Sequence, residues 1–181
     1  MDGRRVRFEA QVAPHLDAAY RFARWLTRSA ADAEDLVQEA MLRAFRSIDA
    51  LRGSEAKPWL LAIVRNCHAS AHRREARHAT VPLPQDYDPQ DGHAMVDPAP
   101  DPESHALSAD AARTLERLLG ALAPEHREVL ALRELEELSY REIAAVTALP
   151  IGTVMSRLAR ARGALKALWL RAPQGELHGV R

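Results

Sequence analysis

The sequence has only one cysteine, Cys67, which excludes an internal disulfide and is typical of a protein of the reducing cytosol. No run approaches the ~20 consecutive apolar residues that cross a bilayer. The N-terminal segment MDGRRVRFEAQ also lacks the apolar stretch of a signal peptide. The formal net charge is zero, so the chain as a whole is not a polycation. We therefore expect a cytoplasmic protein without membrane insertion.

Charge and proline are unevenly distributed along the chain. Residues 79–105 contain no Lys or Arg, six Asp and Glu, and six of the eleven prolines. The flanking blocks are mildly basic, with 14 basic and 10 acidic residues in 1–78, and 11 and 9 in 106–181. The middle segment has no apolar periodicity, which predicts an extended or disordered linker over residues 78–106. A linker of this length reaches ~90 Å when fully extended, so we expect two domains that can separate.

The apolar spacing elsewhere predicts helices and no convincing strand. The expected fold class is all-α, with small helical domains over residues 8–77 and 107–170. The first domain is expected to contain helices over 8–28, over 32–48 with Asp32 as its cap, and from Pro58 onward. The residues expected to face inward are Val12, Leu16, Tyr20, Leu36, Ala40, Ala44, Ile48, Leu60, Val64 and Cys67.

The stretch from Ser139 to Trp169 predicts two helices joined by a tight turn, which is a helix-turn-helix. Ser139 and Glu142 have the spacing of a capping box, in which each side chain accepts an N–H of the other's backbone. Pro150 and Gly152 are expected to break the helical pattern between the two helices. The residues expected to be buried by the second helix are Val154, Leu158, Ala161 and Leu165.

The outer face of this second helix is basic. Residues 150–171 contain four Arg, one Lys and no acid. Ser156, Ala159, Arg160 and Gly163 lie opposite the apolar stripe at 100° per residue. A narrow helix with small residues and basic flanks suits a DNA major groove, although a solvated basic face would show the same pattern. The helix after Pro58 is a second basic helix with the same two interpretations.

Four sequence segments, in this order, resemble a bacterial sigma factor of the extracytoplasmic-function (ECF) type, in the sigma-70 family. The segments are DAEDLVQEAMLRAFR (32–46), PWLLAIVRN (58–66), LAPEHREVLALRELEELSYREIAA (122–145) and GTVMSRLARAR (152–162). The resemblance implies a region 2-like domain over 8–77 and a region 4-like helix-turn-helix domain over 107–170. It also implies core RNA polymerase and promoter DNA as partners, control by an anti-sigma factor, and no enzymatic activity.

The resemblance further implies residue roles, which define three surfaces named here. The polymerase face, which would dock on core RNA polymerase, comprises Asp35, Gln38, Glu39 and Arg43. The −10 surface, which would recognise and melt the promoter −10 element, comprises the loop 51–57 together with Arg65, Asn66, Ala69, Arg73 and Arg74. The −35 face, which would read the −35 element, comprises Thr153, Met155, Ser156, Arg157, Ala159, Arg160 and Arg162.

Two other functions are compatible with parts of the sequence. A helix-turn-helix regulator acting without core polymerase would bind duplex DNA by itself, as a dimer on two half-sites. A metal or hydrolytic enzyme is suggested by His68 and His72, four residues apart, with Cys67 and His78 nearby. However, no HExxH or CxxC pattern is present. We therefore predict no metal, no cofactor and no catalytic residue.

Overall fold

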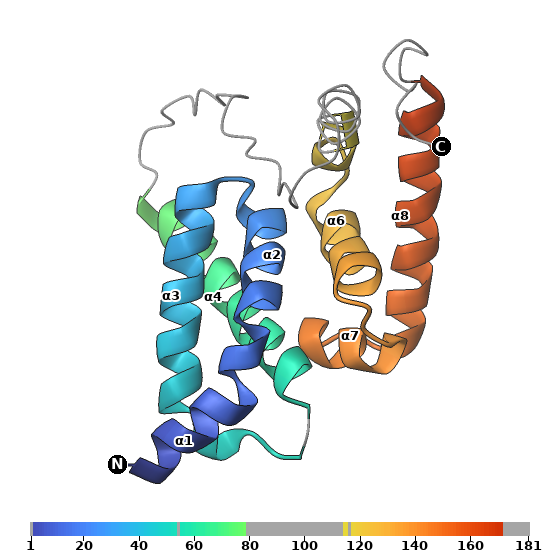
Figure 1. Ribbon diagram of the computed structural model, residues 1–181. Coiled ribbons are helices and arrows are strands. Elements are labelled where there is room, and N and C mark those ends of the chain that lie inside the picture. The colour runs from blue at the N-terminus through green and yellow to red at the C-terminus, as the bar shows by residue number, and fades with distance from the viewer. Residues whose placement is uncertain (1, 54, 79–113, 116, 172–181) are drawn as a thin grey trace, which may run out of the picture.

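The computed structural model describes residues 2–53, 55–78, 114–115 and 117–171, and these residues form two groups of helices (Figure 1). The N-terminal bundle contains α1 (Asp2–Gln11), η1 (Ala13–His15), α2 (Leu16–Thr27), α3 (Ala30–Arg46), η2 (Ile48–Ala50) and α4 (Ala56–His78). The C-terminal bundle contains helical residues within 114–120, then α6 (Pro124–Leu130), the π-helical η3 (Ala131–Leu135), α7 (Tyr140–Thr147) and α8 (Ile151–Arg171). The all-α fold class is confirmed, whereas the predicted linker lies largely outside the described residues.

The first predicted helix, over residues 8–28, is wrong because the chain breaks between α1 and α2. Pro14 lies in the short 3-10 helix η1, where its ring and missing N–H prevent continuation of α1. The break changes the rotational phase of the helix that follows. Leu16, expected inside, is 43% exposed, while Phe22 and Ala23 are fully buried.

Helix α3 begins earlier than predicted, and its cap is Ser29 rather than Asp32. The Ser29 hydroxyl accepts the backbone N–H of Asp32 at 3.3 Å. The Asp32 carboxylate instead lies in the first turn, where the helix dipole favours a negative charge. The predicted inner residues Leu36, Ala40, Ala44 and Ile48 are all buried, with Ile48 in η2.

Helix α4 also begins before its predicted start. Its first residue is Ala56, so Pro58 lies within the first turn instead of at the first position. The missing N–H of Pro58 still costs no hydrogen bond, because N–H groups of the first turn have no acceptor within the helix. Leu60, Val64 and Cys67 are buried as expected.

The helix-turn-helix has the predicted elements but a different turn. Both hydrogen bonds of the Ser139–Glu142 capping box are present, at 2.7 and 3.2 Å. The left-handed residue that ends α7 is Ala148, with φ of 55°, whereas Gly152 lies inside α8. The axes of α7 and α8 are bent by 101° across this turn. This angle lies within the range typical of DNA-binding helix-turn-helix motifs.

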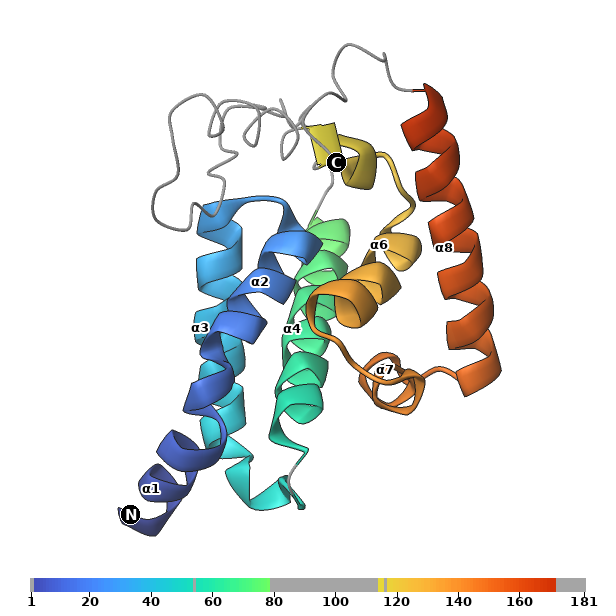
Figure 2. The same ribbon diagram turned by 45° about the vertical axis from the view of Figure 1, so that its right-hand side comes forward.

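The two bundles are in contact. Helix α4 lies beside α7, as Figures 1 and 2 both show, and α2 contacts α6 and η3. One continuous apolar core runs from residues of α2, α3 and α4 to residues of α6, α7 and α8. Among the described helices, none is by itself long and apolar enough to cross a membrane, and only the bent α7–α8 pair reaches that length and composition jointly.

Candidate nucleic-acid and polymerase interfaces

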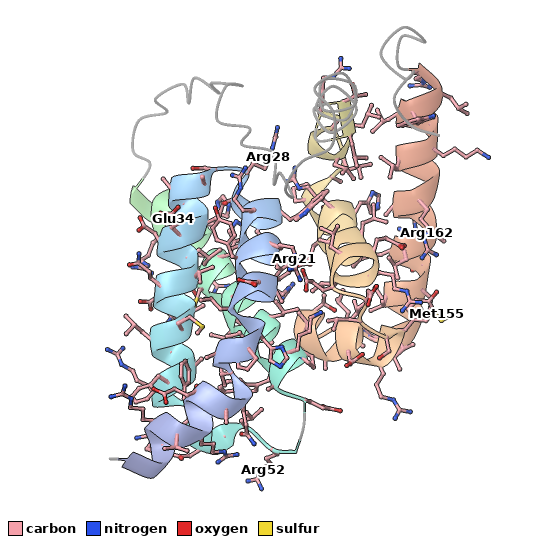
Figure 3. The ribbon with its side chains drawn as sticks, viewed as in Figure 1. Arg21, Arg28, Glu34, Arg52, Met155 and Arg162 are labelled. Carbon is pink, nitrogen blue, oxygen red and sulfur yellow. The ribbon has the colours of Figure 1, made fainter. Side chains whose placement is uncertain are left out.

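Helix α8 has one buried face and one open face. Val154, Leu158 and Ala161 are at most 1% exposed and hold the helix against the rest of its bundle. On the opposite side Met155 is 52% exposed, and Ala159 and Arg160 are also exposed. Three further members of the predicted −35 face, Thr153, Ser156 and Arg157, are half-buried. The predicted set therefore lies on one accessible side, and Met155 marks its N-terminal end in Figure 3.

Hydrogen bonds order part of the −35 face before any ligand is present. The Arg160 guanidinium donates to the Ser156 hydroxyl at 3.4 Å, and that hydroxyl donates to the Thr153 carbonyl at 3.0 Å. The Arg160 side chain is thus directed along the helix toward its N-terminal end. Recognition helices present base-contacting residues from their N-terminal part, so this direction suits a base or phosphate contact.

Arg162 differs from its neighbours because it forms an ion pair within its own bundle. Its Nη2 and Nε donate to Glu134 Oε1 of η3, at 2.6 and 3.1 Å. This hydrogen bond raises the pKa of the Arg162 guanidinium. Arg162 therefore braces α8 against η3 (Figure 3), rather than lying unpaired beside Arg160.

Two glycines of α8 have no packing reason to be glycine. A Cβ atom built on Gly152 or on Gly163 meets nothing within 4 Å, and both residues are exposed. Glycine inside a helix costs about 1 kcal/mol of stability relative to alanine. Because glycine has no side chain, a bound ligand can approach the backbone of α8 closely at these two positions.

The predicted −10 surface is only partly assembled on α4. At 100° per residue, Arg65, Ala69, Arg73 and Asn66 lie within one arc of about 100°. Arg74 lies about 80° beyond Asn66, outside this arc, and its charge lowers the pKa of the buried Cys67 thiol, which is raised mainly by burial. The grouping of Arg74 with the other four stays a prediction.

Two carboxylates of the C-terminal bundle form ion pairs with basic residues of the −10 surface. Arg65 Nε donates to Glu128 Oε1 of α6 at 2.6 Å. Lys57, in the first turn of α4, forms an ion pair with the carboxylate of Glu136 at 3.0 Å and donates to its backbone carbonyl at 2.8 Å. Asn66 and Arg73 remain exposed. Sequence reasoning missed these pairs because their members are far apart in the chain.

The predicted polymerase face lies on the outer side of α3. Asp35 and Gln38 are exposed, and Glu39 accepts a hydrogen bond from Arg43 Nε at 2.6 Å, one turn along the helix. This hydrogen bond raises the pKa of Arg43. The pair fixes both side chains on the same side of α3.

Apolar side chains beside Gln38 extend this face and were not predicted. Leu42 and Phe45 are 54% and 40% exposed. One hollow beside Gln38 is lined by Phe8, Met41, Leu42 and Phe45 between α1 and α3. A second hollow lies on the α2 side of Gln38 and includes Tyr20 and Val37. The sequence signal was available, because Leu42 and Phe45 fall outside the inner stripe of α3.

Comparison with protein families and known proteins gives consistent results for both bundles. The Sigma-70 region 2 model matches residues 12–78, and the Sigma-70 region 4 model matches residues 112–165. The ECF RNA polymerase sigma-E factor of Escherichia coli K12 is 36% identical over 138 residues, which cover 74% of this chain and 72% of that protein.

A second relative and two solved structures extend the comparison. The ECF RNA polymerase sigma factor SigE of Mycolicibacterium smegmatis is 36% identical over 157 residues, and the match covers 86% of this chain and 58% of SigE. The sigma factor RpoE of Bartonella quintana, solved with the anti-sigma factor NepR, aligns with a TM-score of 0.73 at 27% identity, covering 92% of this chain and 98% of RpoE. CnrH, solved with the cytosolic domain of CnrY, has the same fold, with a TM-score of 0.62, 24% identity and coverage of 92% and 89%. With an open basic helix-turn-helix, a second basic helix and this identity over most of its length, the chain belongs to the ECF branch of the sigma-70 family of RNA polymerase sigma factors.

Proposed function

We propose that this chain binds core RNA polymerase and directs promoter-specific transcription initiation by recognising −10 and −35 elements. The observation that carries the proposal is the open face of α8. Its buried stripe fixes the helix, while Met155 and Arg160 face outward at the end of a 101° helix-turn-helix. This arrangement fits insertion of α8 into a major groove.

In this proposal the members of the −35 face other than Arg162 contact base edges and phosphates of the −35 element. Arg160 is the central member, because its guanidinium is already oriented by Ser156 and is not committed to a carboxylate among the described residues. Met155 can make an apolar contact with the methyl group of a thymine. Arg162 acts through Glu134, by holding α8 in place.

The −10 surface works differently in the proposal, because melting exposes single-stranded DNA. Asn66 and Arg73 project from α4 and are exposed. Arginine and amide side chains on a basic helix can hold the backbone of a strand whose bases have unstacked. Unstacking costs a few kcal/mol per base, which contacts to the extruded base and the flanking phosphates must offset. Gly53, at φ of 68°, lies in the predicted loop shortly before α4 begins at Ala56.

Core polymerase would dock on the polymerase face of α3. Asp35 and Gln38 provide polar contacts, while Leu42 and Phe45 provide apolar contacts to bury. An anti-sigma factor is the proposed negative regulator, by analogy with the RpoE–NepR complex. The chain acts in the cytoplasm, where polymerase and promoter meet, and it is a binding factor with no catalytic activity of its own.

Transcription from defined components tests this proposal. Purified chain is added to core polymerase that lacks any sigma factor, genomic fragments serve as templates, and the transcripts are sequenced. We expect transcripts that start downstream of a shared pair of −35 and −10 sequences. An absence of chain-dependent transcripts with active polymerase would contradict the proposal. Tight binding of a palindromic duplex by a dimer in the absence of polymerase would instead favour a stand-alone regulator.

A further inference from the structure

Helix α1 lies across the C-terminal end of α3 and contacts η2 (Figures 1 and 2). The rings of Phe8 and Phe45 pack edge to face at this crossing, with their centroids 5.3 Å apart. Two arginines of α1, Arg4 and Arg7, donate hydrogen bonds to backbone carbonyls at the end of α3 and just after η2. The chain continues from these carbonyls into the predicted −10 loop, residues 51–57. Helix α1 is not part of any of the three predicted surfaces, yet it bonds the backbone that leads into one of them.

Arg7 holds the first residue of this loop. Its Nη2 donates to the Leu51 carbonyl at 2.6 Å, and its Nε donates to the Gln11 side chain at 3.0 Å, one turn along α1. Gln11 therefore fixes the direction of the guanidinium, and the charge of the donor strengthens the bond to the carbonyl. The Leu51 side chain is buried, and the Leu51 N–H donates to the Ile48 carbonyl at 3.1 Å. The Leu51 backbone is thus held through both its N–H and its carbonyl.

Arg4 makes a more exposed contact with the same part of the chain. Its Nη2 donates to the Arg46 carbonyl at 2.7 Å, and its Nε lies 3.2 Å from Asp49 Oδ2. The last carbonyls of a helix have no N–H partner within the helix, and a nearby cation also interacts favourably with the helix dipole. However, the Arg4 and Asp49 side chains are 47% and 67% exposed, and exposed ion pairs contribute little stability. Arg7 is half-buried, so it is the stronger of the two anchors.

The segment between η2 and α4 is short and is bounded by buried residues, Leu51 on one side and Ala56 on the other. Arg52, the residue after Leu51, is exposed and projects away from the helices in Figure 3. The Leu51 carbonyl and the Arg52 N–H belong to one planar peptide unit. A hydrogen bond that fixes this carbonyl therefore also fixes the direction in which the chain enters the loop and the point from which the Arg52 side chain leaves it.

We propose that Arg7 is a positioning residue for recognition of the −10 element, with Arg4 in a supporting role. Arg7 does not touch DNA in this proposal. It holds the peptide between Leu51 and Arg52, so that the loop meets a promoter base in one fixed geometry. A loop that is ordered before binding loses less conformational entropy when it captures a base. The inference deepens the proposed function and rests on it, because it requires residues 51–57 to contact the −10 element.

Base discrimination at the −10 element tests this role. Arg7→Met removes every N–H donor of the side chain and keeps an unbranched aliphatic stem. The measured quantity is the ratio of transcription rates of the holoenzyme on a matched promoter and on the same promoter with one −10 base substituted. This ratio should fall roughly tenfold in Arg7→Met, the scale expected for loss of one hydrogen bond from a charged donor. A defect in folding alone would reduce the amount of active holoenzyme and lower both rates equally, which leaves the ratio unchanged.

Two further variants of α1 are the controls. Arg5→Met removes an exposed arginine of the same helix, whose Nε donates to Glu9 within α1 at 2.8 Å, and it should leave the ratio unchanged. Arg7→Lys retains one charged donor and should keep more of the ratio than Arg7→Met does. The holoenzymes of all three variants should bind a −35 duplex as the parent holoenzyme does, because the −35 face lies on α8.

A measurement without polymerase or DNA tests the contact itself. Amide hydrogen exchange followed by NMR reports local opening around the Leu51 N–H in the free chain. Arg7→Met should speed this exchange about tenfold relative to Arg5→Met, because the hydrogen bond that holds the same residue is lost. Urea denaturation of both variants shows whether a change in global stability contributes to the exchange rate.

Two results would overturn the inference. One is an unchanged exchange rate at Leu51 in folded Arg7→Met. The other is a parent chain that initiates with a clear −10 base preference while Arg7→Met keeps the same ratio. Failure of the parent chain to initiate at any promoter would instead count against the proposed function, and the exchange rate would still decide whether Arg7 orders the loop.

Discussion

Helices α4 and α8 both carry arginines on their outer faces, but these arginines differ in whether a carboxylate binds them. On α8, Arg157 and Arg160 have no carboxylate partner among the described residues, and the face around them is open. On α4, Arg65 is held by Glu128 of the other bundle at 2.6 Å. The comparison teaches that the charge of a helix predicts what it can bind, whereas its neighbours determine when it is available.

The largest expected effect is a difference in stability between substitutions on the buried and the exposed face of α8. Leu158→Ala should destabilise the chain by about 3 kcal/mol, because a side chain only 1% exposed leaves a cavity when truncated. Met155→Ala, at a position 52% exposed, should change stability by less than about 0.5 kcal/mol. Urea denaturation followed by circular dichroism measures both. Equal losses would mean that α8 lacks the inner and outer faces described here.

The next effect concerns the open arginine of α8. Arg160→Ala should weaken binding of a −35 duplex by about 1–3 kcal/mol and relax its base preference, since it removes a proposed base contact. Arg171→Ala, at the far end of the same helix, is the matched control. Fluorescence anisotropy with the holoenzyme and duplex −35 variants gives both values. If the two variants lost affinity equally, general charge rather than a specific contact would explain the binding.

On α4, Arg73 and Arg74 are adjacent in sequence but lie on different sides of the helix. Arg73→Ala should slow promoter opening and lower the slope of affinity against salt by about one, as expected for the loss of one phosphate contact. Arg74→Ala should have a smaller effect, because its charge acts near Cys67. Permanganate footprinting of the melted −10 region compares them. A larger defect for Arg74→Ala would reverse the assignment.

A smaller effect distinguishes stability from binding on α8. Gly163→Ala should stabilise the chain by about 0.5–1 kcal/mol, because it removes a helix-interior glycine at a site with open space around the Cβ. Gly120→Ala should stabilise less, since its Cβ would lie 2.8 Å from Arg28 Nη2 and the end of that flexible side chain would have to shift. Thermal unfolding measures both. Loss of −35 affinity in the more stable Gly163→Ala would show that DNA approaches the backbone there.

The smallest effect is the pH dependence of the α7 cap. Hydrogen bonds from Ser139 lower the pKa of Glu142 below its ordinary value of 4.5. A carboxylate whose pKa is lower in the folded state stabilises the fold above the unfolded-state pKa, and loses this contribution as the pH falls through the folded-state value. Glu142→Gln should therefore be less stable than the parent chain at pH 7, and the difference should shrink on acidification. If the stability difference between Glu142→Gln and the parent chain did not change with pH, the charge of Glu142 would not contribute to the cap.

Local features were predicted well because their causes lie within one turn of helix. The Ser139–Glu142 cap, the buried stripe of α3 and three of the four predicted inner residues of α8 depend only on spacing, whereas the fourth, Leu165, is half-buried. Predictions failed where the helical periodicity was extended across a break between two helices. Pro14 shifted the phase of α2, and the left-handed residue of the turn is Ala148 instead of Gly152.

The sequence by itself determined the helices, the segregation of charge, the helix-turn-helix and the membership of the ECF sigma factors. Tertiary structure alone decided which basic groups are paired between the two bundles. Arg65 and Glu128 are 63 residues apart, and Arg21 and Glu136 are 115 apart. Helical periodicity repeats over a few residues and carries no information at such separations. Only the packing of α2 and α4 against α6, η3 and α7 brings these charges within hydrogen-bonding distance.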